Sequence, residues 1–454
     1  MRLRSDIPIV PLPQAGARSS SNDFRAELSL QRSAGVHRIV HLIGSVHPKA
    51  GGPSTVVTRL AAAQAALGHD VTILSFLTEE SRGAFEKGVA DIPGFEQVRL
   101  ILKPSATSTM WLAKGENRRE LQRVVESADV VHLHGVWEPL LLLGARTAKR
   151  NRIPYVVRPC GMLDPWSLRQ HAVKKRVALA AGYRWMLNNT ACLHVLNADE
   201  KRLIDRLGLT CRKSVIPNGV FLEEIHPLPA RGTFHGAHPE LKDKPYVLFL
   251  SRLHHKKGLD YLLEAFCKVA LKDRDVHLVV AGPDDGMGAE FSRKVLVSGF
   301  ANRVHVVGPL YGEEKLAALA DAALFCLPSR QEGFSLATSE ALACGVPVVI
   351  SEAVHFPEVA QAGAGRVVGL DAEAIAGAML EILGSPVTRT AMGKAGRQLM
   401  ESRFTWPVVA ERCEAMYASA VGKRQARTDM TWRGVAKRMA MPMMQLGRFA
   451  YHLF

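Results

Sequence analysis

Residues 329–351 read SRQEGFSLATSEALACGVPVVIS and set two carboxylates, Glu332 and Glu340, around a turn that opens a helix. The apolar run 323–327 before this stretch predicts a short buried strand, and Pro328 ends it. A strand, a tight turn and a helix in this order are typical of a parallel α/β sheet. The stretch therefore indicates an α/β fold with carboxylates at the end of a strand.

The turn itself is suited to bind an anion. Gly333 permits the bend, and we expect Phe334 and Ser335 to begin the helix. Backbone N–H groups at a helix start have no partner inside the helix and attract negative charge. Glu332 would then lie at the mouth of the loop, with Glu340 further along the helix.

The same alternation runs through the whole chain. Strand-like runs in the first half are followed by helical stretches such as 54–67, and a second series of such runs begins after residue 245. The segment 221–245 between the two series carries prolines, glycines and charges without a strand or helix period. The pattern predicts two Rossmann-like halves, each a doubly wound parallel sheet. The expected strands are 39–43, 71–75, 130–134, 155–158, 193–196, 214–216, 247–251, 276–281, 304–307, 323–327 and 348–351.

Length and composition fit two packed cores. The chain has 454 residues, 47% of them hydrophobic. Its seven cysteines are odd in number and scattered, without a C-x-x-C pair, which argues against a zinc site or a disulfide framework and favours a reducing cytoplasm. Prolines interrupt the apolar patch near the N-terminus, so we expect no signal peptide, and no apolar run reaches the ~18 residues of a transmembrane helix.

The net charge of +15 predicts an acidic partner, which composition alone leaves open between nucleic acid, anionic lipid and phosphorylated substrates. Basic residues are dense in 423–454, where apolar side chains recur at helical spacing. This tail would form a basic amphipathic helix that either rests on anionic lipid or packs on the protein, with Pro442 limiting its length. The apolar positions are Trp432, Val435, Ala436, Met439, Ala440 and Met443.

In an open parallel sheet, ligands bind at the carboxyl ends of the strands, so the loops that follow strands carry the chemistry. After the first strand, Gly51 and Gly52 precede a helix and would let the backbone approach a phosphate, although an ordinary flexible loop fits equally well. The loop is not a G-x-G-x-x-G dinucleotide fingerprint. After the strand at 130–134, alternation points His132 and His134 the same way, and the strand end places His134 at the cleft. A lone histidine at such a position is more often structural.

The second half begins with SRLHHKKG at 251–258, again at the end of a strand. Arg252 and Lys257 can converge there on one diphosphate, because arginine offers a planar fork and lysine a point charge. On the residues alone, a solvated basic loop remains open as an alternative.

These ordered motifs together resemble the retaining glycosyltransferases of family 4, the sucrose-synthase-like group with two facing Rossmann-like domains, known as the GT-B fold. The resemblance covers about residues 37–420 and rests on the E-x7-E element, DVVHLHGVW at 129–137 and RLHHKKG at 252–258. RPCGMLDPW at 158–166 and IPNGV at 216–220 resemble signatures of the exopolysaccharide and lipopolysaccharide branch. Two departures are Ser251, where the family usually has glycine, and Cys160, where histidine or arginine is common.

The resemblance implies roles for individual residues. Arg252 and Lys257 would bind the donor phosphates, Glu332 would orient sugar hydroxyls and Glu340 the ribose, and His134 would lie beside the transferred sugar. The implied catalytic set is Glu332, His134, Arg252 and Lys257. The implied donor-binding set is Gly51, Gly52, Arg252, Lys257, Gly333, Phe334, Ser335, Leu336 and Glu340.

We expect neither a metal ion nor a cofactor apart from the nucleotide-sugar substrate. The only D-x-D motif, 273–275, precedes a strand and so lies at the edge of the sheet away from the phosphates. Because the resemblance supplies no carboxylate placed for attack, retention would come from same-face substitution, in which the departing diphosphate helps to deprotonate the acceptor hydroxyl.

The resulting prediction is a retaining, metal-independent enzyme that moves a hexose from a nucleotide-sugar to an acceptor sugar, lipid-linked, in bacterial surface polysaccharide synthesis. Its place would be the cytoplasm or the inner face of the plasma membrane. Alternatives are a sugar-nucleotide epimerase of the same fold, a glycosidase, and a basic nucleic-acid-binding protein, although no aromatic-interleaved basic stripe supports nucleic acid as a partner. The predicted segments are a flexible arm (1–35), an acceptor domain (36–222), a linker (223–245), a donor domain (246–403), a helix crossing back to the first domain (404–421) and the basic tail (422–454).

Overall fold

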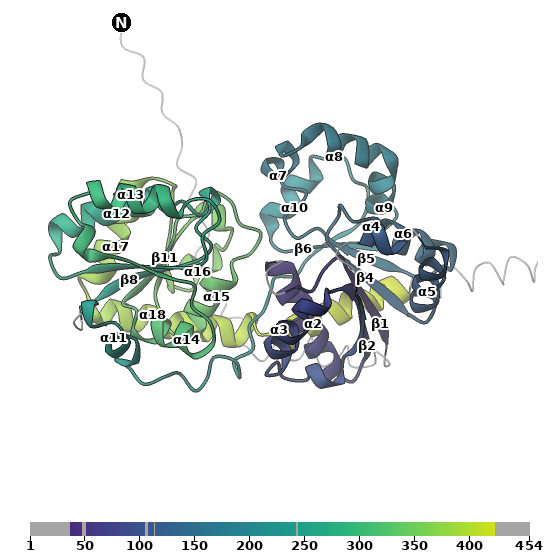
Figure 1. Ribbon diagram of the computed structural model, residues 1–454, viewed down its shortest axis with the longest axis horizontal. Coiled ribbons are helices and arrows are strands. Elements are labelled where there is room, and N and C mark those ends of the chain that lie inside the picture. The colour runs from purple at the N-terminus through teal and green to yellow at the C-terminus, as the bar shows by residue number, and fades with distance from the viewer. Residues whose placement is uncertain (1–36, 48–50, 105–107, 113, 242–243, 423–454) are drawn as a thin grey trace, which may run out of the picture. The chain divides into compact units, whose positions relative to one another are not determined.

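A computed structural model describes residues 37–47, 51–104, 108–112, 114–241 and 244–422. The expected N-terminal arm, the amphipathic tail helix and residues 48–50 of the glycine loop lie outside the described residues. Two parallel sheets, each covered by helices, make up the described chain (Figure 1). The predicted fold of two Rossmann-like α/β domains is confirmed.

The first sheet has seven parallel strands in the order β3-β2-β1-β4-β5-β6-β7. The order reverses beside β1, so the loops after β1 and β4 open at a point where a parallel sheet can receive a ligand. The strands are β1 (Arg38–Ile43), β2 (Asp70–Phe76), β3 (Arg99–Lys103), β4 (Val130–His134), β5 (Tyr155–Arg158), β6 (Cys192–Val195) and β7 (Lys213–Val215). Its helices include α2 (Gly52–Ala66), α3 (Glu79–Val89), α4 (Ser108–Leu112), α5 (Gly115–Glu126), α6 (Pro139–Arg150), α7 (Pro165–Arg169), α8 (Ala172–Ala178), α9 (Arg184–Asn188) and α10 (Ala198–Asp205).

The second sheet has six parallel strands in the order β10-β9-β8-β11-β12-β13. Its strands are β8 (Tyr246–Leu250), β9 (His277–Ala281), β10 (Val304–Gly308), β11 (Leu324–Leu327), β12 (Val348–Ser351) and β13 (Gly365–Val368). Its helices are α11 (Thr233–Ala237), α12 (Leu259–Lys272), α13 (Gly288–Val297), α14 (Gly312–Asp321), α15 (Leu336–Ala343), α16 (Glu358–Gln361), α17 (Ala372–Leu383) and α18 (Pro386–Arg403).

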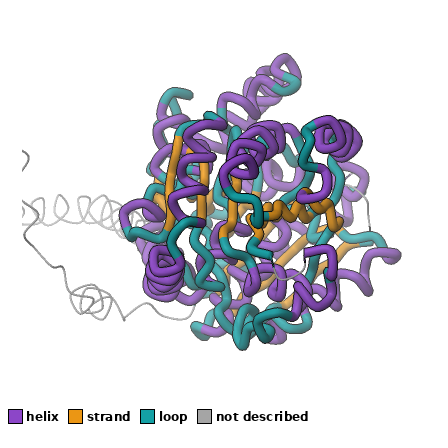
Figure 2. The backbone as a smooth tube through the Cα atoms, turned by 90° about the vertical axis from the view of Figure 1, so that its left-hand side faces the viewer, coloured by secondary structure: helices purple, strands orange, loops and turns teal. Residues whose placement is uncertain are grey.

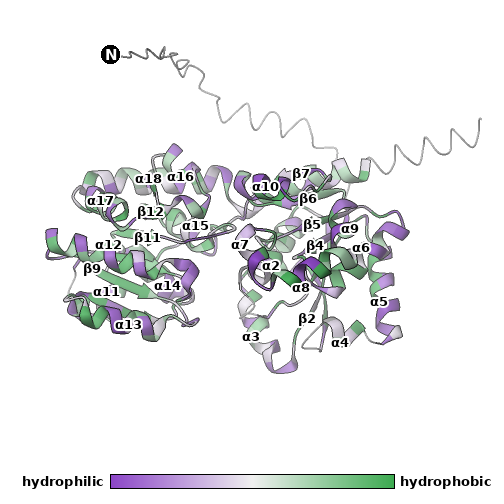
Figure 3. Ribbon diagram, turned by 90° about the horizontal axis from the view of Figure 1, so that it is seen from above, coloured by the Kyte–Doolittle hydropathy of each residue, from purple (hydrophilic) through white to green (hydrophobic). Residues whose placement is uncertain are grey.

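Burial explains why these segments are strands. Central strands such as β4, β8 and β11 are buried along their whole length, as expected for parallel sheets with helices on both faces. Figure 2 shows the strands enclosed by helices, and Figure 3 shows strands mainly in hydrophobic green with hydrophilic residues on the surrounding helices. Among the described residues, no helix combines the length and apolarity needed to span a bilayer.

The chain returns to the first domain after α18, as predicted. Phe404 belongs to the core of the second domain, whereas Trp406 and Tyr417, on the helix 406–422, are buried in a core of the first. At the crossing, Trp406 donates its backbone N–H to the carbonyl of Val220 at 3.0 Å. The crossing helix is therefore part of the first domain's core.

The structure corrects three details of the sequence prediction. The segment 221–245 is not free of helix, because α11 forms there, with Asp321 accepting hydrogen bonds from the backbone N–H groups of Gly232 and Phe234. The edge strands β3 and β13 were not predicted. The helix of the E-x7-E element begins at Leu336, one position after its N-cap Ser335.

Candidate functional site

A cavity of about 450 Å³ is lined by strand-end loops of both domains. The loops after β8 and β11 form the wall from the second domain, and the loops after β5 and β7, with the start of α2, form the wall from the first. Of the predicted site residues, these line it: Gly52, Arg252, Lys257, Glu332, Gly333, Phe334, Ser335 and Leu336. Gly51, Glu340 and His134 are not part of the lining.

The loop after β8 brings its cations against the E-x7-E loop because of one glycine. Gly258 has a φ of 71°, and a Cβ at this position would overlap the carbonyl oxygen of Pro328. Any larger residue would therefore push the two loops apart. This close approach places Lys257 beside Glu332.

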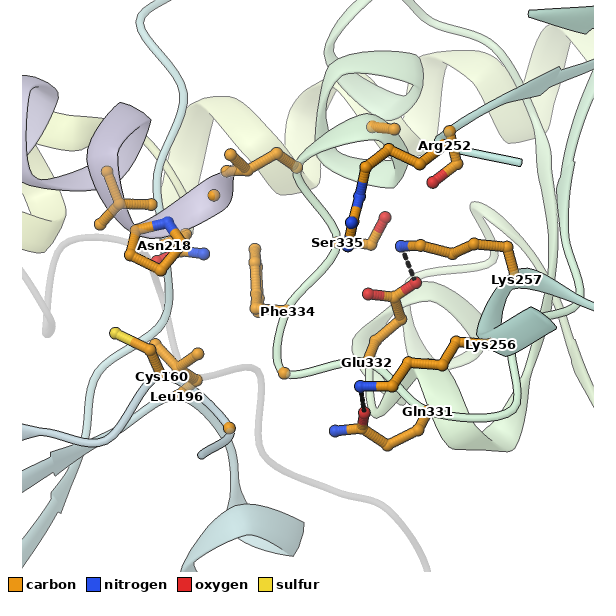
Figure 4. A pocket seen from close by; sticks show the side chains of 18 of the residues that line it. Cys160, Leu196, Asn218, Arg252, Lys256, Lys257, Gln331, Glu332, Phe334 and Ser335 are labelled. Carbon is orange, nitrogen blue, oxygen red and sulfur yellow. Dashed lines mark hydrogen bonds and ion pairs between the residues drawn. The ribbon is translucent and has the colours of Figure 1, made fainter. Parts of the chain in front are cut away.

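Lys257 and Glu332 form an ion pair in the cavity wall. The Lys257 Nζ lies 2.6 Å from Glu332 Oε1, and the hydroxyl of Ser329 donates to the same oxygen at 2.7 Å. Figure 4 shows the pair, with Arg252 beside it. Both side chains are shielded, with exposed fractions of 15% and 11%. The carboxylate is therefore held in one orientation, with its second oxygen available to a ligand.

The neighbouring cations differ in their surroundings. Arg252 is exposed and pairs with Asp285 at 2.5 Å. Lys256 donates to Gln331 at 3.1 Å and lies over the ring of Trp166, with its Nζ 3.6 Å from the ring centroid. Burial lowers the pKa of Lys256. Three cations thus occupy one wall of the cavity.

The start of α15 completes this wall. The Ser335 hydroxyl accepts a hydrogen bond from the backbone N–H of Thr338 and caps the helix. Gly333 packs against Leu196, and its carbonyl accepts a hydrogen bond from the amide of Asn197 at 2.6 Å, so that the turn is tied to the first domain. The cations and the N-terminus of α15 therefore favour an anion at the cavity.

On the first-domain wall, α2 begins at Gly52 without a side-chain cap. Its N-cap Gly51 has a φ of 88°, and a Cβ on either glycine would meet no atom of the described residues within 4 Å. The space beside the helix start is therefore open to a ligand. Cys160, where the family commonly has histidine or arginine, also lines this wall, and burial raises the pKa of its thiol to about 11.

His134 lies elsewhere than predicted. Its side chain shares a face with His132, as the alternation implied, with ring centroids 4.4 Å apart. However, His134 is only 2% exposed and is not part of the cavity lining. The expectation that the strand end opens it to the cleft is wrong in this structure, because the side chain turns into the core beneath the crossing helix.

A chain of hydrogen bonds explains why these histidines are buried. The carbonyl of Ile216 can only accept, so Nε2 of His194 donates to it at 2.9 Å, and the other ring nitrogen of His194 accepts from Nε2 of His132 at 3.3 Å. Nδ1 of His132 then accepts from the hydroxyl of Tyr417 at 2.7 Å. Each neutral imidazole is therefore held in a single tautomer.

The chain continues through α2. The amide of Gln64 donates to the Tyr417 oxygen at 3.0 Å and accepts from Nε2 of His41 at 2.8 Å. Nδ1 of His41 then accepts from Nε2 of His134 at 2.8 Å. Nδ1 of His134 ends the chain as a buried acceptor without a partner among the described residues.

Burial lowers the pKa of His41 to about 4 and lowers the pKa values of His132, His134 and His194 well below their usual range. Nitrogens of His41, His132 and His134 lie within 4.8 Å of one another, close enough for a metal ion. Both nitrogens of His41 and of His132 are already used in the hydrogen-bonded chain. The cluster therefore fits a structural polar chain better than a metal centre.

Glu340 also lies outside the cavity lining. Its carboxylate pairs with Lys315 of α14 at 2.9 Å. The expected ribose contact would have to form beside this ion pair.

The sequence reasoning assigned no role to several residues of the cavity wall. Lys256 and Gln331 are adjacent to predicted residues, whereas Arg158 and Asn218 lie in the RPCG and IPNG motifs that carried the resemblance. The motifs marked these positions, but only the fold shows that both loops end at one cavity.

Two family models match the chain. A glycosyl transferase 4-like domain matches residues 51–219, and the glycosyl transferases group 1 model matches residues 244–385. The first match spans β2 to β7 with α2 to α10, and the second spans β8 to β13 with α12 to α17. The pair of matches thus follows the division seen in the structure.

Several curated relatives are mannosyltransferases. The chain is 29% identical over 332 residues to the GDP-mannose-dependent alpha-(1-6)-phosphatidylinositol monomannoside mannosyltransferase of Mycolicibacterium smegmatis, covering 70% of this chain and 84% of the relative. It is 31% identical over 176 residues to the GDP-mannose-dependent monoacylated alpha-(1-6)-phosphatidylinositol monomannoside mannosyltransferase of Corynebacterium glutamicum, covering 37% of this chain. That second match spans 45% of the relative's own length.

Among solved structures, the Anabaena protein HepE in complex with UDP and glucose aligns with a TM-score of 0.66 at 18% identity, covering 84% of this chain and all of HepE. At this identity the likeness shows the fold alone. This likeness gives the chain the GT-B fold, and the two family models, which together match 51–219 and 244–385, show that it is a glycosyltransferase with a glycosyl transferase 4-like first domain and a group 1 second domain.

Proposed function

We propose that this enzyme transfers a hexose from a nucleotide-sugar to a lipid-linked acceptor, with retention of the anomeric configuration and without a metal ion. The observation that carries the proposal is the cavity wall on which Arg252, Lys257 and the start of α15 converge beside Glu332. Positive side chains and free backbone N–H groups suit a departing nucleoside diphosphate.

The residues divide the work of the reaction. Arg252 and Lys257 stabilise the charge that develops on the diphosphate as the glycosidic bond breaks. Glu332, whose one oxygen is fixed by Lys257 and Ser329, presents its other oxygen to sugar hydroxyls. Since Arg252 pairs with Asp285 and Lys257 with Glu332, donor binding must compete with existing ion pairs.

The relatives support a lipid acceptor, because the names of both describe transfer to phosphatidylinositol mannosides. A surface of this chain also suits a membrane. On α8, Val173 and Val177 are 75% and 63% exposed and lie one helical turn apart. On the surface of the helix, the exposed Lys174 and Arg176 flank this pair on its two sides. Exposed apolar side chains among cations fit an anionic lipid surface.

The decisive experiment begins with the donor. Thermal unfolding with GDP, UDP and ADP should show stabilisation by one of them, about 2.7 kcal/mol when the nucleotide is at 100 times its dissociation constant. The matching nucleotide-sugar is then incubated with phosphatidylinositol and polyprenyl-linked acceptors, and the anomeric configuration of the product is read by NMR. No stabilisation by any nucleotide would refute the donor assignment, and an inverted product would refute retention.

A further inference from the structure

Two side chains on the first-domain wall of the cavity fix one another. Arg158, the last residue of β5, donates from Nη2 to the amide oxygen of Asn218, and both residues line the cavity. A guanidinium carries only donors, so a flipped amide would place donors against donors. The NH₂ group of Asn218 is therefore turned away from Arg158, on the wall opposite Arg252 and Lys257 (Figure 4).

Arg158 is a buried charge that no described carboxylate contacts directly. It is 1% exposed, its Nε and Nη1 have no partner among the described residues, and no described carboxylate lies within 4.0 Å. Burial raises the pKa of Glu200, and the charge of Arg158 opposes this shift. The two are not in contact, because the Glu200 oxygens accept hydrogen bonds from the backbone N–H groups of Leu196 and Gly161. Burial and the charge of Arg158 both lower the pKa values of His132, His134 and His194. A buried cation of this kind is unfavourable unless an anion approaches it.

The start of α2 adds positive potential to the same wall. Gly52 lines the cavity, and the first turn of α2 contains no acidic residue. The wall thus combines an oriented amide donor, a buried cation and a helix N-terminus. These features favour a ligand group that carries negative charge and several acceptor oxygens.

We propose that this wall binds a phosphate group of the acceptor, with Asn218 as the contact residue and Arg158 as the positioning residue that also supplies charge. The inference rests on the proposed function, in which Arg252 and Lys257 on the opposite wall hold the donor diphosphate, and it assigns to the acceptor two residues, Asn218 and Arg158, that are outside the implied donor-binding set. A tetrahedral phosphate can accept from an amide and from backbone N–H groups at once, whereas a carboxylate holds its two oxygens in one plane. The phosphate can belong to a lipid headgroup or to a free phosphorylated sugar.

The test uses the full chain saturated with whichever of GDP or UDP stabilises it more. Glycerol 3-phosphate is titrated into the protein by calorimetry. Glycerol and glycerate, which have the same carbon skeleton, are titrated in parallel for comparison. We expect glycerol 3-phosphate to bind and the other two not to bind. Competition by phosphatidylinositol vesicles, but not by mannose 1-phosphate, assigns the phosphate to a lipid headgroup, and the reverse assigns it to a free sugar phosphate.

Variants separate recognition from folding. Asn218→Asp places a carboxylate beside Arg158, so the thermal midpoint should stay equal or rise while affinity for glycerol 3-phosphate falls by about tenfold or more. Arg158→Met should weaken phosphate binding similarly, and Arg158→Lys should retain more affinity than Arg158→Met. Asn302→Asp, on an exposed turn of the second domain, is the matched change of charge and should bind as the wild type does.

The outcomes distinguish the two proposals. If neither nucleotide binds the wild type, the proposed function fails. If a nucleotide binds but glycerol 3-phosphate does not, or binds Asn218→Asp as tightly as the wild type, the phosphate wall is refuted and the donor assignment stands. Equal binding of glycerate would show that any anion suffices and would overturn the assignment to phosphate.

Discussion

Lys257 and Glu332 neutralise each other where a substrate would bind. Because both side chains are largely shielded from solvent, removing the lysine leaves a carboxylate whose remaining side-chain donor is the hydroxyl of Ser329. Breaking one partner of a buried pair costs about 3–5 kcal/mol. The sequence alone suggests that Lys257→Ala would fold normally, but the structure predicts a loss of stability that would obscure its kinetics.

Arg252 offers the cleaner test of phosphate binding. Its guanidinium is exposed and pairs with an exposed Asp285, so Arg252→Ala should change the free energy of unfolding by less than about 1 kcal/mol. Transfer should fall on the order of 10²-fold, because the lost charge acts mainly on the leaving group. Arg366→Ala, which breaks a comparable exposed pair with Glu381, is the control and should keep wild-type turnover. Wild-type turnover of Arg252→Ala would contradict the assignment.

The two glutamates should differ in kinetics. Glu332 faces the cavity, so Glu332→Gln should mainly lower kcat. Glu340 lies outside the lining and is paired with Lys315, so Glu340→Gln should mainly raise KM for the donor, if its second oxygen holds the ribose. Steady-state kinetics with thermal midpoints for both variants checks this. Full kcat in Glu332→Gln, with kcat abolished in a folded Glu340→Gln, would reverse the roles.

The sequence predicted which loops form the site better than it predicted the directions of individual side chains. Motif order correctly placed Arg252, Lys257 and Glu332 at one cavity, because strand ends of a parallel sheet meet at one edge. It misplaced His134, because a strand-end position does not reveal the role of Tyr417, 283 positions later in the chain. Tyr417 forms a hydrogen bond with His132 on the same face of the sheet, and this face is buried under the crossing helix. Long-range partners of this kind leave no local signal.

Among the elements, the crossing helix depends on the polar chain that it completes. Tyr417→Phe keeps the ring but leaves Nδ1 of His132 without a donor and the amide of Gln64 without an acceptor. We expect a loss of about 1–3 kcal/mol in the free energy of unfolding, measured in urea. Tyr311→Phe, at an exposed position, should change it by less than about 0.5 kcal/mol. Equal stability of the two variants would show that the chain is not stabilising.

Most strands were readable in the sequence, the edge strands β7 and β10 included, whereas the edge strands β3 and β13 were not. The residues of β8 and β11 are buried along their whole length and form continuous apolar runs. β3 and β13 lie at the edges of their sheets, are half-buried and carry arginines or lysines that blur the pattern. α11 is short and depends on Asp321, a cap from a distant segment, which explains why its sequence resembles an irregular linker.

At the scale of the whole molecule, α8 should place the first domain on a membrane. Val173→Asp with Val177→Asp introduces charge into the exposed apolar pair and should reduce sedimentation with anionic vesicles by about tenfold. Val297→Asp, at a similarly exposed position on α13, is the control. Binding should fall with added salt, because the lysine and arginine beside the pair contribute electrostatic attraction. If the double variant still sediments as the wild type does, another surface must carry any lipid binding.

Global stability should fall as the pH drops below about 6.5. Burial lowers the pKa values of His41, His132, His134 and His194 in the folded state, so the unfolded chain takes up protons first. Above pH ~6.5 both states are neutral at these sites and the stability is complete. Below this pH, each histidine lowers the free energy of unfolding by about 1.4 kcal/mol per pH unit until the pH reaches its pKa in the folded state, which is about 4 for His41. Glu200 acts in the opposite sense, because burial raises its pKa.

Urea unfolding between pH 7 and pH 4.5 measures this slope, and one substitution tests its source. In His194→Gln, the amide can still donate to the carbonyl of Ile216 and accept from His132, so the chain persists with one fewer titrating group. The slope should then decrease by about 1.4 kcal/mol per pH unit. His171→Asn, at an exposed position outside the chain, should leave the slope unchanged. An unchanged slope in His194→Gln would mean that acid destabilises the protein through groups other than the buried histidines.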